Sequence, residues 1–186
     1  MDKKKIISSA ITIGAAGALL IGATFAFFTD TGSSSDNVFS TGTLDLQLGN
    51  GATESATFSD DVTATFGEDN MAPGDCDEVG TLSIKNAGTI GADLEMTANN
   101  TNGALTPYLR IDVLTYDGSP VAVSDDNTNT YNDLQDLATN SPVALGSLSA
   151  GEVAELTLQV CLDESAPDAV QGASNTLTLS FTLTSN

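Results

Sequence analysis

The stretch GEVAELTLQVCL, residues 151–162, alternates apolar and polar side chains along its length. Its apolar set is Ala154, Leu156, Leu158, Val160 and Leu162, and the opposite set is Glu155, Thr157, Gln159 and Cys161. A period of two is typical of a β-strand with one packed face and one solvated face. The stretch therefore predicts a long strand of an antiparallel sheet.

Similar alternation recurs along the chain, separated by turns rich in Gly, Pro and Asn. Strands are predicted from residue 43 to 48 and at 62–66, 81–85, 92–96, 108–116, 121–123 and 176–183. Within 108–116 we expect Leu109, Ile111 and Val113 to face inward, and 131–138 to form one or two helical turns. Seven or eight such strands predict an all-β fold, an antiparallel β-sandwich of jelly-roll type.

The N-terminus has the three parts of a secretory signal peptide: a basic head at residues 3–5, an apolar run at 6–23, and a small residue, Ala26, at the expected cleavage point. We predict a signal peptide at 1–26, a flexible segment at 27–39, a sandwich domain at 40–186, and a secreted protein. Two alternatives stay open. Residues 6–28 are long enough to cross a bilayer as an uncleaved anchor, and a type IV pilin leader would be cut before the apolar run.

Charge limits the possible partners. The chain has 25 acidic and 5 basic residues, and loss of residues 1–26 would leave a net charge of −22. This excludes ordinary nucleic-acid binding, which needs a basic patch, and argues against adhesion to anionic lipid, so we expect contact with the membrane only during export. Such self-repulsion is screened in molar salt, which favours a halophilic source over an acidic secreted protein from an ordinary habitat.

Two cysteines and one sequon are candidate modification sites. In an exported chain Cys76 and Cys161 are permitted to form a disulfide, the alternative being two buried thiols. We favour the disulfide because Cys161 lies opposite the apolar side chains of its strand and is not expected in the core. Asn99 begins the one N-glycosylation sequon that avoids proline, where a strand is expected to give way to a loop.

Three stretches carry a family resemblance. AFFTD at 26–30 with FSTGTLDL at 39–46, MAPGD at 71–75 with LSIKNAG at 82–88, and VQGASN at 170–175 before the last strand are similar to motifs of the TasA/camelysin family. Those proteins are secreted through a SipW-dependent type of signal peptide, and several build extracellular fibres. The region from about 99 to 146 matches no family motif that we recognise.

The resemblance implies a fibre subunit that polymerises with itself, together with an accessory or anchoring subunit as a further partner. Residues 27–39 would leave their own domain and add as a strand to the next subunit, anchored by Phe27, Phe28, Val38 and Phe39. The centre of this segment, GSSS at 32–35, is poor in β-formers. The alternatives are a monomeric surface- or matrix-binding module, in which 27–37 is only a tail, and the metallopeptidase activity attributed to camelysin.

Enzymatic chemistry finds little support in the residues. The chain contains no histidine, which excludes a HExxH zinc site and any nucleophile activated by histidine. We predict no enzyme, no cofactor and no metal. Acidic pairs at 60–61, 75–78, 125–126 and 163–164 could bind a hard cation, yet none shows the twelve-residue EF-hand spacing with its closing Glu. We interpret them as solvated acidic surface.

Overall fold

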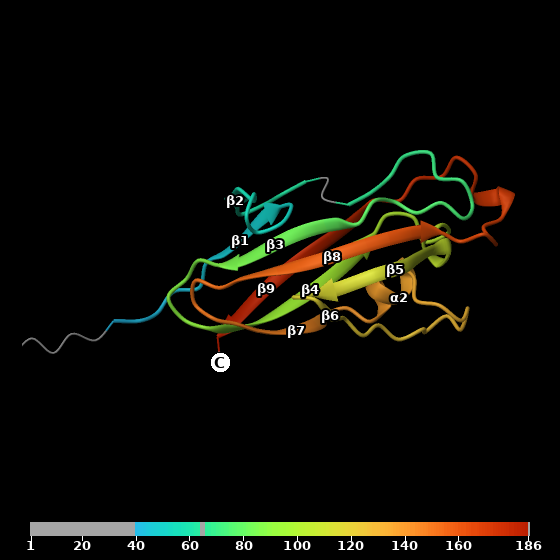
Figure 1. Ribbon diagram of the computed structural model, residues 1–186. Helices are drawn as coiled ribbons and strands as arrows, with labels where there is room; N and C mark the ends of the chain where they lie inside the picture. The colour runs from blue at the N-terminus through green and yellow to red at the C-terminus, as the bar shows by residue number, and fades with distance from the viewer. Residues whose placement is uncertain (1–39, 64–65, 186) are drawn as a thin grey trace, which may run out of the picture. The chain divides into compact units, whose positions relative to one another are not determined.

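The computed structural model describes residues 40–63 and 66–185, and its elements are labelled in Figure 1. The described residues form nine strands, the helix α2 and two short 3₁₀ segments, η1 and η2. Their bounds are β1 Leu46–Asn50, β2 Phe58–Ser59, β3 Gly80–Asn86, β4 Ala92–Asn100, η1 Thr106–Tyr108, β5 Leu109–Tyr116, β6 Ser119–Pro120, α2 Leu134–Thr139, β7 Val143–Leu148, β8 Val153–Leu162, η2 Asp168–Val170 and β9 Leu177–Ser185.

Two antiparallel sheets make up the unit that begins at Thr41. The larger sheet has the order β2-β1-β3-β8-β5-β6, and the smaller has the order β7-β4-β9. From β3 to β9 the chain passes alternately between the sheets, apart from the short β5–β6 hairpin (Figure 1). This arrangement confirms the predicted all-β, jelly-roll-like antiparallel sandwich.

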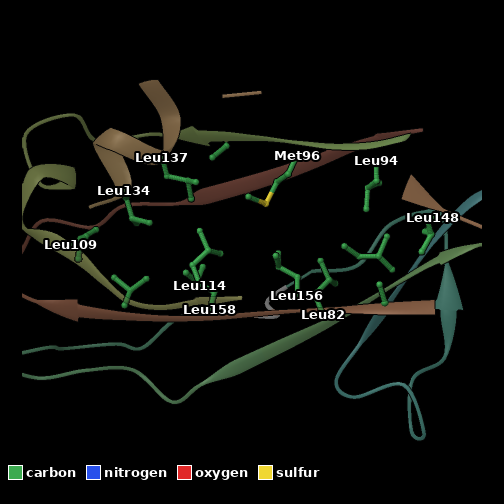
Figure 2. Packing of buried hydrophobic residues seen from close by; sticks show 14 of the residues in the cluster. Leu82, Leu94, Met96, Leu109, Leu114, Leu134, Leu137, Leu148, Leu156 and Leu158 are labelled. Carbon is green, nitrogen blue, oxygen red and sulfur yellow. The ribbon is translucent and has the colours of Figure 1, made fainter. Parts of the chain in front are cut away.

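The core fills the space between the sheets. Figure 2 shows side chains of β4, among them Leu94 and Met96, facing Leu82, Leu156 and Leu158 of the larger sheet. Leu94, Met96, Leu156 and Leu158 are fully buried, as the alternation within β4 and β8 predicts. Leu134 and Leu137 of α2 also join the core, so the predicted helical turns around 131–138 are present.

The strand predictions need three corrections. In β5 a register shift between Ile111 and Val113 interrupts the alternation, so Leu114, opposite Leu158, is buried instead of Val113. The predicted strand at 121–123 is absent, because the chain turns back through Asp117 and Gly118 and pairs at Ser119–Pro120. Residues 62, 63 and 66 lie in no strand, whereas β2 forms nearby.

The chain enters the sandwich beside the loop that follows β3. Ala87 N donates to Asp45 O at 2.7 Å, and Thr89 N donates to Thr43 O at 2.9 Å. Gly88 lies between these two bonds, and a Cβ atom there would lie 2.9 Å from Asp45 N. A side chain at this position would therefore push the entering segment away.

Candidate strand-acceptor groove

β9 is an edge strand of the smaller sheet. It pairs with β4 from Leu177 opposite Asn100 to Ser185 opposite Ala92, a register of nine residue pairs. On its other side it has no strand partner among residues 40–63 and 66–185. A strand with one unpaired side offers free N–H and C=O groups to another extended segment.

Burial differs sharply between β9 and its neighbour β4, although both alternate in the same way. The inward residues of β4 are at most 2% exposed: Ala92, Leu94, Met96 and Ala98. The inward residues of β9 are only partly buried: Leu177, Leu179, Phe181 and Leu183. The apolar face of β9 is therefore left incompletely covered by the described part of the chain.

A groove of about 1150 Å³ lies along this uncovered face. Its apolar floor combines Leu177, Leu179 and Phe181 of β9 with residues of the larger sheet, among them Leu82 and Leu158. Residues 66–73 and most of residues 166–176 line it as well. An apolar floor beside an unpaired strand edge can receive an extended peptide, whose side chains fill the floor while its main chain pairs with the edge.

A buried carboxylate lies in the wall of the groove. Asp77 is 5% exposed, and its Oδ1 accepts a hydrogen bond from Val160 N at 2.7 Å. Burial raises the pKa of Asp77, the Val160 N–H opposes this, and the nearby negative charge of Glu68 adds to the rise. The interpretation of residues 75–78 as solvated acidic surface is therefore wrong for Asp77, because the chain folds it back onto β8.

A disulfide holds the same segment. The sulfur atoms of Cys76 and Cys161 are bonded, at 2.04 Å, and residues 74–77 run alongside the end of β8. Gly74 N donates to Leu162 O at 2.7 Å, and Asp77 N donates to Val160 O at 2.9 Å. The expectation that Cys161 stays out of the core is wrong: it is 2% exposed, because this segment covers that side of β8.

The other predicted site residues are not brought into one place. The cleavage residue Ala26 and the anchors Phe27, Phe28, Val38 and Phe39 lie outside the described residues, so their roles stay predictions. Asn99 is exposed near the end of β4, opposite Thr178 of β9. Its modification also stays a prediction.

Two acidic residues that the sequence reasoning missed are fully buried. Asp133 and Asp136, at the start of α2, are each 0% exposed. The signal that could have found them is the interval from Asp125 to Asp136, a twelve-residue spacing that closes on Asp instead of Glu. Across the described residues, no group of three or more His, Cys, Asp or Glu side chains is placed to hold a metal ion.

Comparison with known proteins places the chain in a family. The model of the family described as camelysin metallo-endopeptidase matches residues 2–186. No individual curated protein matches the chain significantly. In the described part of the chain, no helix has the length and apolar character needed to span a bilayer.

Proposed function

The chain belongs to the camelysin metallo-endopeptidase family, which includes TasA, and from this premise we propose that it is an extracellular fibre subunit. Proteins of this family are generally secreted or associated with the cell surface. The subunit polymerises head-to-tail when residues 27–39 of one copy add as a strand beside β9 of the next.

The partial burial of the inward face of β9 is the observation that carries this proposal. A strand added at this edge covers Leu177, Leu179 and Phe181 and pairs with the free main-chain groups of β9. β4 flanks the inward face of β9 on one side. The apolar side chains of the added strand would flank it on the other side. A self-contained sandwich would not be expected to leave this strand half covered.

The spacing of the proposed anchors suits a strand. Phe27 and Phe39 are twelve residues apart and share one face of an extended segment, whereas Phe28 and Val38 share the other. Either face therefore carries one apolar anchor at each end. The segment spans about 40 Å and nine-residue β9 about 30 Å, so one anchor reaches beyond β9 towards residues 166–176.

The ends of the sandwich give the contact its direction. The chain enters beside Gly88, at the end where Ser185 pairs with Ala92. The groove extends past Leu177, at the opposite end of β9, to residues 166–176. The described chain thus begins at one end of the sandwich, and the groove extends to the other. Because the proposed donor and acceptor surfaces are different, the contact is head-to-tail and gives an open filament.

Electron microscopy of the secreted protein in molar salt tests the proposal, because at about 1 M salt the Debye length is only ~3 Å and charge repulsion is screened. We expect fibres whose axial repeat is close to one domain length. Deletion of residues 27–37 should abolish them, and the deleted protein should bind a synthetic peptide of residues 27–39. Monodisperse particles together with no peptide binding would refute strand donation and favour the monomeric binding module.

A matched pair of variants tests the acceptor side. Leu179 points into the groove, whereas Ser180 is exposed on the outer face of the same strand and does not line the groove. Leu179→Asn should weaken peptide binding at least tenfold, which corresponds to about 1.4 kcal/mol. Ser180→Asn should leave the binding unchanged. Equal effects of the two substitutions would place the peptide away from the groove.

This subunit has no catalytic role in the proposal, although its family is described by a peptidase activity. The chain has no histidine with which to build a HExxH zinc site. Incubation of the secreted protein with casein, with and without a chelator, checks this point. Cleavage that the chelator stops would show that the protein is a metallopeptidase.

A further inference from the structure

The loop between β6 and α2 and the first turn of α2 carry oxygen-bearing side chains at defined spacings. Positions 1, 3, 5, 9 and 12 of the twelve-residue run 125–136 are Asp125, Asn127, Asn129, Asp133 and Asp136. These positions, with the carbonyl oxygen of position 7, supply the ligands of an EF-hand calcium loop. Position 7 is Tyr131. Position 6, usually glycine, is Thr130, whose φ of 81° matches the left-handed conformation of a turn.

The structure brings most of these side chains together around one carboxylate. Asn127 Nδ2 and Asn129 Nδ2 each donate to Asp133 Oδ2 at 2.7 Å. A half-turn of each amide would place its oxygen beside that carboxylate oxygen and would break the hydrogen bonds that Asn127 Oδ1 and Asn129 Oδ1 now accept from Asn129 N and Tyr131 N. Asp125 is held at the opening of the loop, where its Oδ2 accepts from Thr130 N at 2.9 Å.

The second observation is buried negative charge without a counter-charge. Asp133 and Asp136 are both 0% exposed, and neither forms an ion pair with a described residue. The described part of the chain has two basic side chains: Lys85 lies over the ring of Phe58, and Arg110 pairs with Asp112 at 3.4 Å. Two adjacent buried carboxylates are unfavourable unless a positive charge compensates them.

Helix capping accounts for only half of these oxygens. Asp133 Oδ1 accepts from Gln135 N and Asp136 N, and Asp136 Oδ2 accepts from Asp133 N, which completes a capping box. Asp133 Oδ2 and Asp136 Oδ1 take no part in the cap and accept hydrogen bonds from residues 126–129 of the loop. These loop donors satisfy the two oxygens but bring no positive charge to the buried carboxylates.

We propose that residues 125–136 bind one calcium ion through the side chains at positions 1, 3, 5, 9 and 12 and the carbonyl oxygen of Tyr131. The ligands are all oxygen, which selects a hard cation, and six protein ligands suit Ca²⁺ better than Mg²⁺, which usually keeps several waters. The three aspartates alone are not placed to hold a metal ion in the described part of the chain, so the site depends also on the two amide oxygens and the carbonyl oxygen. The inference is independent of strand donation.

Calorimetric titration of the full secreted chain with CaCl₂, after removal of bound ions by a chelator, tests the site. We expect one ion per chain, with a Kd on the order of 10⁻⁴–10⁻³ M, as in other extracellular modules. At ten times the Kd, the Tm should rise by roughly 3–6 °C. A second readout is Tb³⁺ emission excited through tyrosine, because Tyr131 belongs to the loop, and Ca²⁺ should quench it by displacement.

Neighbouring aspartates provide a matched pair of variants. Asp125 is position 1, whereas Asp126 is position 2, where its exposed side chain accepts from Asn140 Nδ2 at 2.7 Å. Asp125→Asn should weaken calcium binding at least about tenfold, since affinity follows the number of charged ligands. Asp126→Asn removes the same charge and should change the Kd by less than twofold. No binding by the wild-type chain, or equal weakening by both substitutions, would overturn the proposal.

Discussion

Asn86, at the end of β3, ties the two sheets together through its side chain. It is 0% exposed, its Nδ2 donates to Ile90 O at 2.9 Å and to Leu148 O of β7 at 3.1 Å, and its Oδ1 accepts from Gly88 N at 3.0 Å. Asn86→Ala removes all three hydrogen bonds. It also leaves a buried carbonyl group, that of Leu148, without its side-chain donor.

The expected loss follows from these contacts. Three hydrogen bonds at about 1 kcal/mol each, with an added penalty for the carbonyl left without its donor, give roughly 3–5 kcal/mol. At about 2–4 °C per kcal/mol for a chain of this size, the Tm should fall by roughly 10 °C. Asn86→Asp keeps the acceptor oxygen but turns a carboxylate towards two carbonyl oxygens. At neutral pH it should therefore destabilise at least as much as the alanine.

Urea unfolding followed by far-ultraviolet circular dichroism measures these differences, because the chain has no tryptophan to report by fluorescence. Asn99→Ala, at an exposed position of β4, is the control and should change the free energy of unfolding by less than about 1 kcal/mol. Acidification should partly restore Asn86→Asp, because burial raises the pKa of this carboxyl and its protonated form can donate again. A loss below about 1 kcal/mol for Asn86→Ala would refute the reasoning.

Three further predictions concern other parts of the sandwich. Reduction of the Cys76–Cys161 disulfide, which joins residues 85 apart, should lower the free energy of unfolding by about 4–5 kcal/mol, measured by urea unfolding with and without reductant. Gly88→Ala should destabilise the fold and speed proteolysis near residue 43, because its Cβ would meet the entering main chain; unchanged digestion would contradict this. Hydrogen bonds from the main-chain N–H and the hydroxyl of Thr53 lower the pKa of Glu155. The stability that Glu155→Gln removes should therefore be fully present above about pH 4.5, and it should vanish as the pH falls through this lowered pKa.

The sequence predicts the strands whose side chains alternate without interruption. β8 and β9 follow from their period of two, and so does the inward face of β4. β7 was not predicted, because Gly146, with a φ of 109°, interrupts its alternation where the pairing with β4 shifts register. The bulge in β5 was not predicted either. An inserted residue changes which side chains face inward, and the composition of the strand does not reveal it.

The candidate sites depend on tertiary arrangement in different degrees. The alternation of β9 predicts an apolar face, but only the strand order shows that the far side of β9 lacks a neighbour in the described residues. The burial of Cys161 depends on residues 74–77, which are distant in sequence. The spacing from Asp125 to Asp136, by contrast, could be read from the sequence, and it was missed because the search required a closing Glu.

The disulfide also has a mechanical consequence. It encloses β3, β4, β5, β6, β7 and nearly all of β8, whereas β1, β2 and β9 lie outside the closed loop. A pull on the two ends of the chain can peel off the outer strands but cannot extend the enclosed residues, which would otherwise add roughly 280–310 Å of contour length. In a fibre under tension, each subunit would therefore yield at its joints and in its outer strands, and the enclosed residues would not be drawn out until the sulfur–sulfur bond breaks.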